Sequence, residues 1–303
     1  KVAALMAPAI IGTSAVQINV LINTYFVSGI EGAQGWLSYS FRLMQFPIGL
    51  FGVAVGTAAI PVLSRLAAEG KITQFRDTIS SSMNLVFLMT LPSACGLIVL
   101  GEPIVRLIYE RGKFDATATS MTAIALAGYS IGLTGYAAIK ILSPAFYALD
   151  DAKTPMIIAV ASIAVNFLGS YFLREWLSGF GVSPATPHGY GHVGVALATS
   201  IVALVNFFAL ALIMRKRVHR LNGRAIFASF MKIAAASAVL SAVCYVSYRA
   251  IASVYGTGSI SVQLIEAFVP IALGGAAFVL TAKLLRVAEL EQLFGMMRRK
   301  LAR

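Results

Sequence analysis

Residues Trp36–Arg65 read WLSYSFRLMQFPIGLFGVAVGTAAIPVLSR, and this stretch decides the fold class. It is long and apolar enough to cross a bilayer, yet Arg42 stands about two helical turns inside its first end. A charge facing lipid at that depth costs roughly 3 kcal/mol or more, so we expect Arg42 to face a cavity. Wound as a helix, the stretch gathers polar residues and glycines within an arc of about 100°. This predicted cavity face holds Gly35, Ser38, Arg42, Gln45, Gly49, Gly52 and Gly56.

The composition is that of a membrane protein. Of the 303 residues, 58% are hydrophobic and 12% are charged, and the mean hydropathy is +0.83. These values indicate an all-α polytopic membrane protein. We predict about eight transmembrane helices, over Val2–Ser28, Trp36–Leu63, Ile79–Leu100, Thr119–Leu142, Pro155–Leu173, Val193–Met214, Ile226–Tyr248 and Val262–Leu285.

The basic residues predict an orientation. If both ends of the chain are cytoplasmic, the inner loops and tails hold eighteen Lys and Arg and the outer loops hold five, which is the usual bias. The run RKRVHRLNGR at 215–224 indicates a topology determinant and a contact for anionic membrane lipids. Because the positive charge lies mostly in the loops of a membrane protein, the net charge of +12 does not indicate a nucleic-acid partner. In the outer loop 101–118 we expect an amphipathic helix lying on the membrane surface.

The first predicted helix is polar on two sides. Gly12, Asn19 and Asn23 share one face, whereas Gln17 lies on another. Such a helix should be surrounded by protein or cavity, and Pro8 and Gly12 allow it to bend.

The fifth predicted helix carries polar residues at every fourth position, Ser162, Asn166 and Ser170, which form one stripe. Neutral oxygens without a carboxylate make a weak cation site, so hydrogen bonding between helices is the alternative use. The candidate cation site consists of Asn23, Asn166, Ser170 and Thr199.

The connection between the fourth and fifth predicted helices contains turn signals. Pro144 should kink or end the fourth helix, and Thr154 is a candidate cap with Pro155 at the first helical position. Lys140 either extends to the inner interface or contacts substrate.

The ionisable residues argue against an enzyme. The first six predicted helices have no Asp or Glu in their cores, and the glycines between His188 and His192 disfavour a helical metal-binding pair. Cys95 and Cys244 lie in apolar runs, so we expect neither a disulfide nor a metal, and no cofactor. A buried arginine without a carboxylate favours an anion, and guanidinium binds phosphate through two parallel hydrogen bonds. We predict an anionic substrate, a phosphate or diphosphate.

Two motifs resemble a known family. They read RLMQFPIGLFGVAVGTAAIPVLSR at 42–65 and SPAFYALDDAKTP at 143–155, and QIN at 17–19 adds to them. They resemble the MurJ (MviN) lipid II flippases of the MATE-like transporter superfamily. The resemblance implies the C-terminal part of a fourteen-helix protein, helices seven to fourteen, with a missing N-terminal lobe as partner. Residues 1–214 would form a six-helix lobe, 215–225 a cytoplasmic linker and 226–303 two peripheral helices with a basic tail.

The resemblance also implies a substrate and a mechanism. Arg42 would bind the diphosphate or the sugar–peptide headgroup of lipid II, and we add Ser38, Gln45, Gln17 and Asn19 as candidate substrate contacts. The lobes would rock by alternating access in the bacterial inner membrane. The candidate hinge positions are Pro8, Gly12, Pro47, Gly49, Gly52 and Gly56.

The chain departs from the family pattern at two positions. Many relatives carry acidic residues where this chain has Phe41 and Asn23, which weakens the case for cation coupling through this lobe. Two alternative functions stay open: a flippase for another lipid-linked oligosaccharide, and a membrane scaffold that transports nothing.

Overall fold

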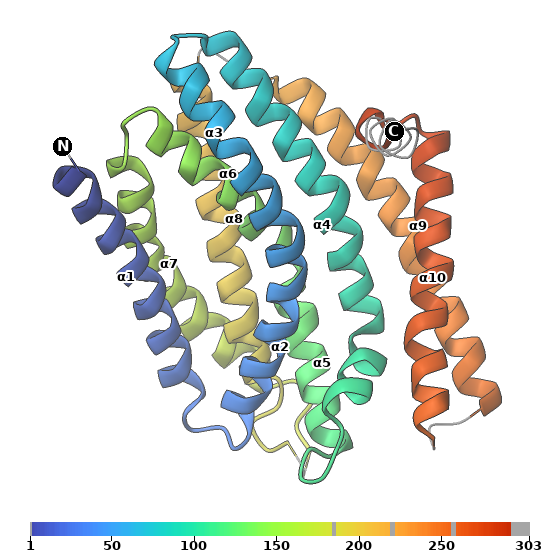
Figure 1. Ribbon diagram of the computed structural model, residues 1–303. Coiled ribbons are helices and arrows are strands. Elements are labelled where there is room, and N and C mark those ends of the chain that lie inside the picture. The colour runs from blue at the N-terminus through green and yellow to red at the C-terminus, as the bar shows by residue number, and fades with distance from the viewer. Residues whose placement is uncertain (1, 184–185, 219–221, 256–258, 292–303) are drawn as a thin grey trace.

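The computed structural model describes residues 2–183, 186–218, 222–255 and 259–291, which form a bundle of long helices (Figure 1). Seven helical spans of the described residues are long and apolar enough to cross a membrane, and there are eight if the α5–α6 pair, bent by 44°, counts as one span. These seven or eight spans confirm the prediction of an all-α polytopic membrane protein with about eight transmembrane helices. The elements are α1 Val2–Val27, α2 Ala33–Pro47, the π-helical segment η1 Ile48–Val53, α3 Ala54–Ala68, α4 Ile72–Tyr109, α5 Ala116–Ser130, α6 Leu133–Ala148, α7 Lys153–Ser178, α8 Gly191–Arg217, α9 Gly223–Tyr255 and α10 Ile260–Leu284.

The second span is a continuous helix of three parts, α2, η1 and α3. Pro47 closes α2, and because proline has no N–H to donate, the normal hydrogen-bond ladder is interrupted where the π-helical segment begins. A π turn holds about one residue more than an α turn, so it rotates everything after it by roughly 100°. The helix therefore presents a different face below and above this segment.

This rotation corrects the predicted glycine face. Arg42, Gln45 and Gly49 are exposed on one side, whereas Gly52 and Gly56 are buried against α6. A Cβ added at Gly52 would lie 3.1 Å from Ala137 Cα, and one at Gly56 only 2.6 Å from the Lys140 carbonyl oxygen. These two glycines allow close helix packing and do not line the face of Arg42.

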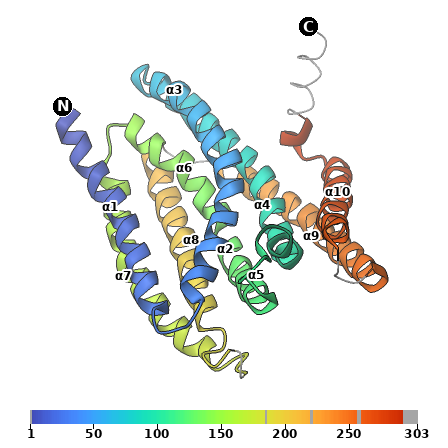
Figure 2. The same ribbon diagram turned by 60° about the horizontal axis from the view of Figure 1, so that its bottom comes forward.

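Two clusters of buried apolar side chains hold the bundle together. The upper cluster, near the end where α1 begins in Figure 1, includes Phe75, Phe146 and Met214 from α4, α6 and α8. The lower cluster, near the opposite end, includes Met44 and Leu126 from α2 and α5. The α9–α10 pair lies beside α4 at one side of the bundle (Figure 2).

The helix ends differ from the prediction in two places. The amphipathic helix expected within residues 101–118 is the last part of α4, which runs through Pro92 and Pro103 to Tyr109. Similarly, α6 continues past Pro144 to Ala148. A proline removes one helical hydrogen bond, and here the packed neighbours of both helices outweigh that loss.

The start of α7 is capped by a different residue from the one expected. The Asp151 carboxylate accepts hydrogen bonds from the Thr154 N–H at 3.0 Å and from the Thr154 hydroxyl at 2.8 Å. Thr154 therefore donates these hydrogen bonds, and the Asp151 carboxylate is the group that caps the first turn of α7.

Candidate functional site

Arg42 lies on a face of α2 that other helices of the bundle leave uncovered. Helices α1 and α2 diverge from the turn at residues 28–32, as both ribbon views show (Figures 1 and 2). Arg42, Gln45 and Ser38 of α2 are exposed, and the Ser38 hydroxyl donates to the Gln34 carbonyl at 2.7 Å. Within the described part of the chain, Arg42 forms no ion pair with a carboxylate, and its charge interacts with the Tyr109 phenol. The guanidinium therefore keeps donors available for an anion.

The two polar faces predicted on α1 have different surroundings. Gln17 is exposed, as Arg42 is. Asn19 instead faces α7, where its Nδ2 donates to the Ser162 hydroxyl at 3.1 Å. A Cβ added at Gly12 would lie 3.7 Å from Met156 Cα, so Gly12 also faces α7. Of the five predicted substrate contacts, four are thus exposed on α1 and α2, whereas Asn19 is engaged in packing.

The predicted hinge positions are partly accounted for. Pro47 adjoins the π-helical segment that contains Gly49 and Gly52, and Gly56 follows it. The side-chain environment of Pro8 lies outside the described residues. Bending at these positions during transport stays a prediction.

The candidate cation residues do come together, between α1, α7 and α8. Asn166 Nδ2 donates to Asn23 Oδ1 at 2.9 Å and to the Asn19 carbonyl at 3.2 Å, and Asn23 Nδ2 donates to the Thr199 hydroxyl at 3.0 Å. The buried Asn166 Oδ1 and Ser170 Oγ have no partner among the described residues. No group of three His, Cys, Asp or Glu in the described residues suits a metal ion. The contacts themselves join three helices, and cation binding stays a prediction.

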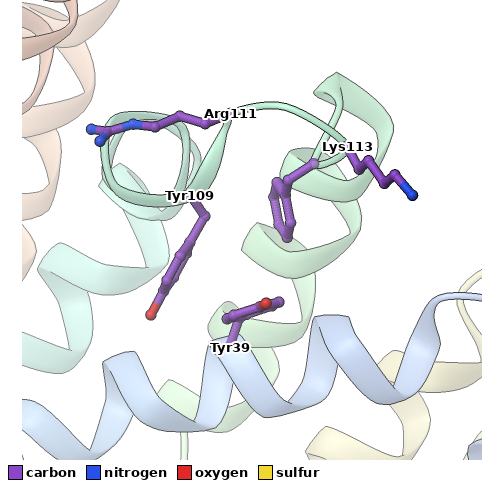
Figure 3. A pocket seen from close by; sticks show the side chains of 5 residues that line it. Tyr39, Tyr109, Arg111 and Lys113 are labelled. Carbon is purple, nitrogen blue, oxygen red and sulfur yellow. The ribbon is translucent and has the colours of Figure 1, made fainter.

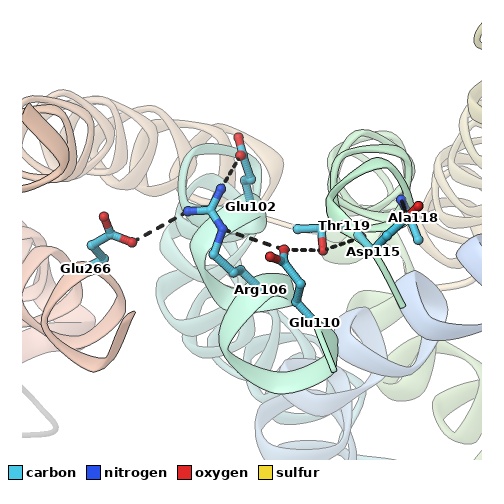
Figure 4. A network of polar contacts seen from close by, with 7 residues as sticks. All are labelled: Glu102, Arg106, Glu110, Asp115, Ala118, Thr119 and Glu266. Carbon is cyan, nitrogen blue, oxygen red and sulfur yellow. Dashed lines mark hydrogen bonds and ion pairs between the residues drawn. The ribbon is translucent and has the colours of Figure 1, made fainter. Parts of the chain in front are cut away.

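An ion network at the lower end was not predicted (Figure 4). Arg106 on α4 is 13% exposed and contacts the carboxylates of Glu102 at 2.7 Å, Glu110 at 3.7 Å and Glu266 at 3.6 Å. Glu266 belongs to α10 and is fully buried, so this ion pair links α10 to α4. The spacing of Glu102, Arg106 and Glu110 by four residues could have indicated the network, because i,i+4 pairs meet on a helix.

A pocket of about 330 Å³ opens near this network (Figure 3). Its lining residues come from α2, the end of α4 and the loop that follows: Tyr39, Tyr109, Arg111, Lys113 and Phe114. From the sequence, this loop was expected at the membrane surface, and its contact with α2 was not predicted.

The upper end carries a basic surface, and one of its ion pairs joins the end of α8 to the loop before α7. Arg217 contacts the Asp151 carboxylate at 3.0 Å. Burial alone would raise the pKa of Asp151, but hydrogen bonds from Thr154 and the charge of Arg217 outweigh it and hold that pKa below its ordinary value. Arg215, Lys216 and Arg224 are exposed nearby.

Comparison with known proteins identifies the family. The model of the family described as "Lipid II flippase MurJ" matches residues 1–266. The chain belongs to the MurJ family. A MurJ protein of Burkholderia cenocepacia, named "Lipid II flippase MurJ", is 36% identical over 218 residues, which cover 72% of this chain and 40% of that protein. A "Probable lipid II flippase MurJ" of Vibrio cholerae is 34% identical over 211 residues, covering 68% and 37%. The chain thus spans about two fifths of the length of these curated MurJ relatives.

Solved structures agree with the MurJ assignment. The structure titled "Lipid II flippase MurJ, inward closed conformation" has a TM-score of 0.70 and 26% identity, covering 96% of this chain and 53% of that one. An outward-facing multidrug resistance MATE family transporter of the MOP superfamily has a TM-score of 0.52 at 16% identity, covering 95% and 66%, which indicates a shared fold. The predicted family and MATE-like fold are both confirmed.

Proposed function

We propose that this chain forms one half of the path by which a lipid II flippase moves its substrate across the bacterial inner membrane. Membership of the MurJ family supports the substrate, lipid II, an undecaprenyl-diphosphate-linked disaccharide peptide. Residues 1–214 form the transporting lobe, residues 215–225 a basic linker and residues 226–303 an additional helical pair with a basic tail. The remaining lobe of the same protein faces α1 and α2, and transport proceeds by alternating access without covalent chemistry.

The observation that carries this proposal is the exposed, unpaired Arg42. Its charge lies within a membrane-spanning helix, where a cation is costly unless it faces a cavity or a partner. In the described residues no carboxylate neutralises it, so a diphosphate can take that role with two parallel hydrogen bonds. Gln45 and Ser38 on α2 and Gln17 on α1 are also exposed, so their polar groups are available to the headgroup.

The orientation follows from the basic surface. The upper end, where α1 begins and α10 ends, faces the cytoplasm, because exposed Arg215, Lys216, Arg224 and Lys283 gather there. The same cations bind anionic membrane lipids. The lower end, with the pocket and the Arg106 network, then faces the opposite side of the membrane.

Native mass spectrometry of the full-length protein tests the role of Arg42. Lipid II is added together with an anionic phospholipid as competitor, and wild type is compared with Arg42→Ala and Arg42→Lys. A lost charge-assisted contact costs about 1.5–3 kcal/mol, so lipid II binding should weaken about 10- to 100-fold in Arg42→Ala. Lysine should restore binding only in part, because it lacks the planar fork.

Arg65→Ala is the matched control. Arg65 lies at the end of the same span, and its side chain is 69% exposed. Selective binding that survives in Arg65→Ala but not in Arg42→Ala supports the proposal. If lipid II binds the wild-type protein no better than the phospholipid does, the proposed function is wrong. Intact growth of a MurJ-depleted strain on Arg42→Ala would refute the role of this residue.

A further inference from the structure

The lower-end pocket is built from three aromatic rings of different parts of the chain. Tyr39 comes from α2, Tyr109 from the last turn of α4 and Phe114 from the loop before α5. The ring centroids lie 4.7 Å apart for Tyr39–Tyr109, 5.5 Å for Tyr39–Phe114 and 6.0 Å for Tyr109–Phe114. These are typical distances for interacting aromatic pairs, so the rings hold one another in place. The pocket's volume of about 330 Å³ is at the small end of the range for ligand sites.

Two cations stand at the rim of this pocket. Figure 3 shows Arg111 and Lys113 extending to opposite sides of the loop above the rings. Gly112 between them has a φ of 61°, a conformation that favours glycine and allows the tight turn. Both cations are exposed.

The carboxylates of the same loop are engaged elsewhere. Glu110 accepts a hydrogen bond from the Thr119 hydroxyl at 2.6 Å and pairs with Arg106 at 3.7 Å. Asp115 accepts a hydrogen bond from the Ala118 N–H at 2.8 Å and so caps α5. Consequently Arg111 and Lys113 have no carboxylate partner in the part of the chain that the structure describes.

The chemistry of the pocket defines the ligand class. Aromatic faces are apolar and carry partial negative charge, so they attract the C–H face of a sugar ring. Arg and Lys at the rim attract carboxylates. A phosphodiester headgroup offers one anion and no flat apolar face, so it uses only half of this site. The combination fits a carboxylate-bearing saccharide or sugar–peptide.

We propose that this pocket binds the carboxylate-bearing sugar–peptide portion of lipid II at the lower end of the bundle. The inference rests on the proposed function and adds a second subsite to it, next to the diphosphate at Arg42, whose charge interacts with Tyr109 of the pocket. Tyr39 lies three residues before Arg42, so both project from neighbouring turns of α2. The rings hold the sugar, and Arg111 and Lys113 hold the peptide carboxylates.

Binding of a tail-free probe tests the pocket. The probe is the soluble disaccharide–peptide without diphosphate or lipid, titrated by calorimetry into the full-length protein in nanodiscs. Its Kd should rise at least tenfold in the double variant Arg111→Gln/Lys113→Gln and in Tyr39→Leu. Tyr39→Phe keeps the ring and should bind like the wild type, which separates loss of stacking from misfolding. Arg249→Gln is the control, because Arg249 is an exposed cation on α9 that contacts Tyr245 and does not line the pocket.

The competing source of an anion is an ordinary phospholipid headgroup. Glycerophosphoglycerol should fail to displace the probe, and a probe with its carboxyl groups amidated should bind weakly. Equal displacement by glycerophosphoglycerol, unchanged affinity in the variants, or no binding to the wild type would each refute the pocket. If wild type still transports lipid II in that case, the proposed function stands; if wild type does not bind intact lipid II, the proposed function fails as well.

Discussion

The π-helical segment in the second span makes a prediction about two glycines. Gly49 and Gly56 are seven residues apart, so they would share a face on a straight α-helix. In the structure a Cβ added at Gly49 meets nothing within 4 Å, whereas one at Gly56 would lie 2.6 Å from the Lys140 carbonyl oxygen. Alanine should therefore be tolerated at Gly49 and should push α3 away from α6 at Gly56.

The two substitutions should change the free energy of unfolding in opposite directions. Overpacking of this kind costs about 1–3 kcal/mol, and the blocking atom is backbone, which cannot rotate away. Gly49→Ala should instead gain up to about 1 kcal/mol from the helix propensity of alanine. At about 2–4 °C per kcal/mol, Gly56→Ala should lower the unfolding temperature by several degrees, while Gly49→Ala leaves it unchanged or slightly raised.

Thermal unfolding of the full-length protein in detergent, followed by fluorescence-detected size exclusion, measures both variants side by side. Equal behaviour of Gly49→Ala and Gly56→Ala would mean that the two glycines have the same surroundings. That result would refute both the rotation caused by the π-helical segment and the close contact with α6.

Two further predictions concern charges. Arg106→Gln leaves the buried Glu266 without a cation and should destabilise the protein by about 3 kcal/mol. The double variant Arg106→Gln/Glu266→Gln should recover much of this loss in the same thermal assay. A double variant no more stable than the single one would contradict the predicted ion pair between Arg106 and Glu266. Because folding lowers the pKa of Asp151 below its ordinary 3.8, its ionised form stabilises the fold above that pH and the benefit disappears as the pH falls through the lowered value. The difference in stability between wild type and Asp151→Asn should therefore be constant near neutral pH and shrink below about pH 4, and a difference that does not change with pH would contradict this reasoning.

The spans could be predicted because hydropathy depends only on the chain. The face of α1 that carries Asn19 and Asn23 could also be predicted, since helical periodicity fixes which residues point together. In the second span, the residues that share the exposed face of Arg42 were predicted correctly only as far as Gly49. Beyond it, the extra residue of the π turn depends on how α3 packs against α6, which the periodicity of one helix does not contain.

The lower-end groups were missed for a related reason. Arg106 fell in the outer loop 101–118, where a separate helix on the membrane surface was expected, yet α4 continues to Tyr109. His192 was likewise expected in the outer loop before the predicted helix Val193–Met214. It is fully buried at the start of α8, where its Nε2 lies 3.1 Å from the Met121 carbonyl oxygen. Such contacts join residues distant in the chain, and local sequence does not reveal them.

The length of α4 bears on how the pocket is reached. Its 38 residues extend about 57 Å at 1.5 Å each, compared with roughly 30 Å for the hydrocarbon core of a bilayer. A tilt of about 20° shortens that reach only slightly. The ends of α4 therefore belong to the headgroup and water layers, and Tyr109 lies at one of them. A molecule can enter or leave the pocket from the hydrated layer without dissolving in the acyl chains.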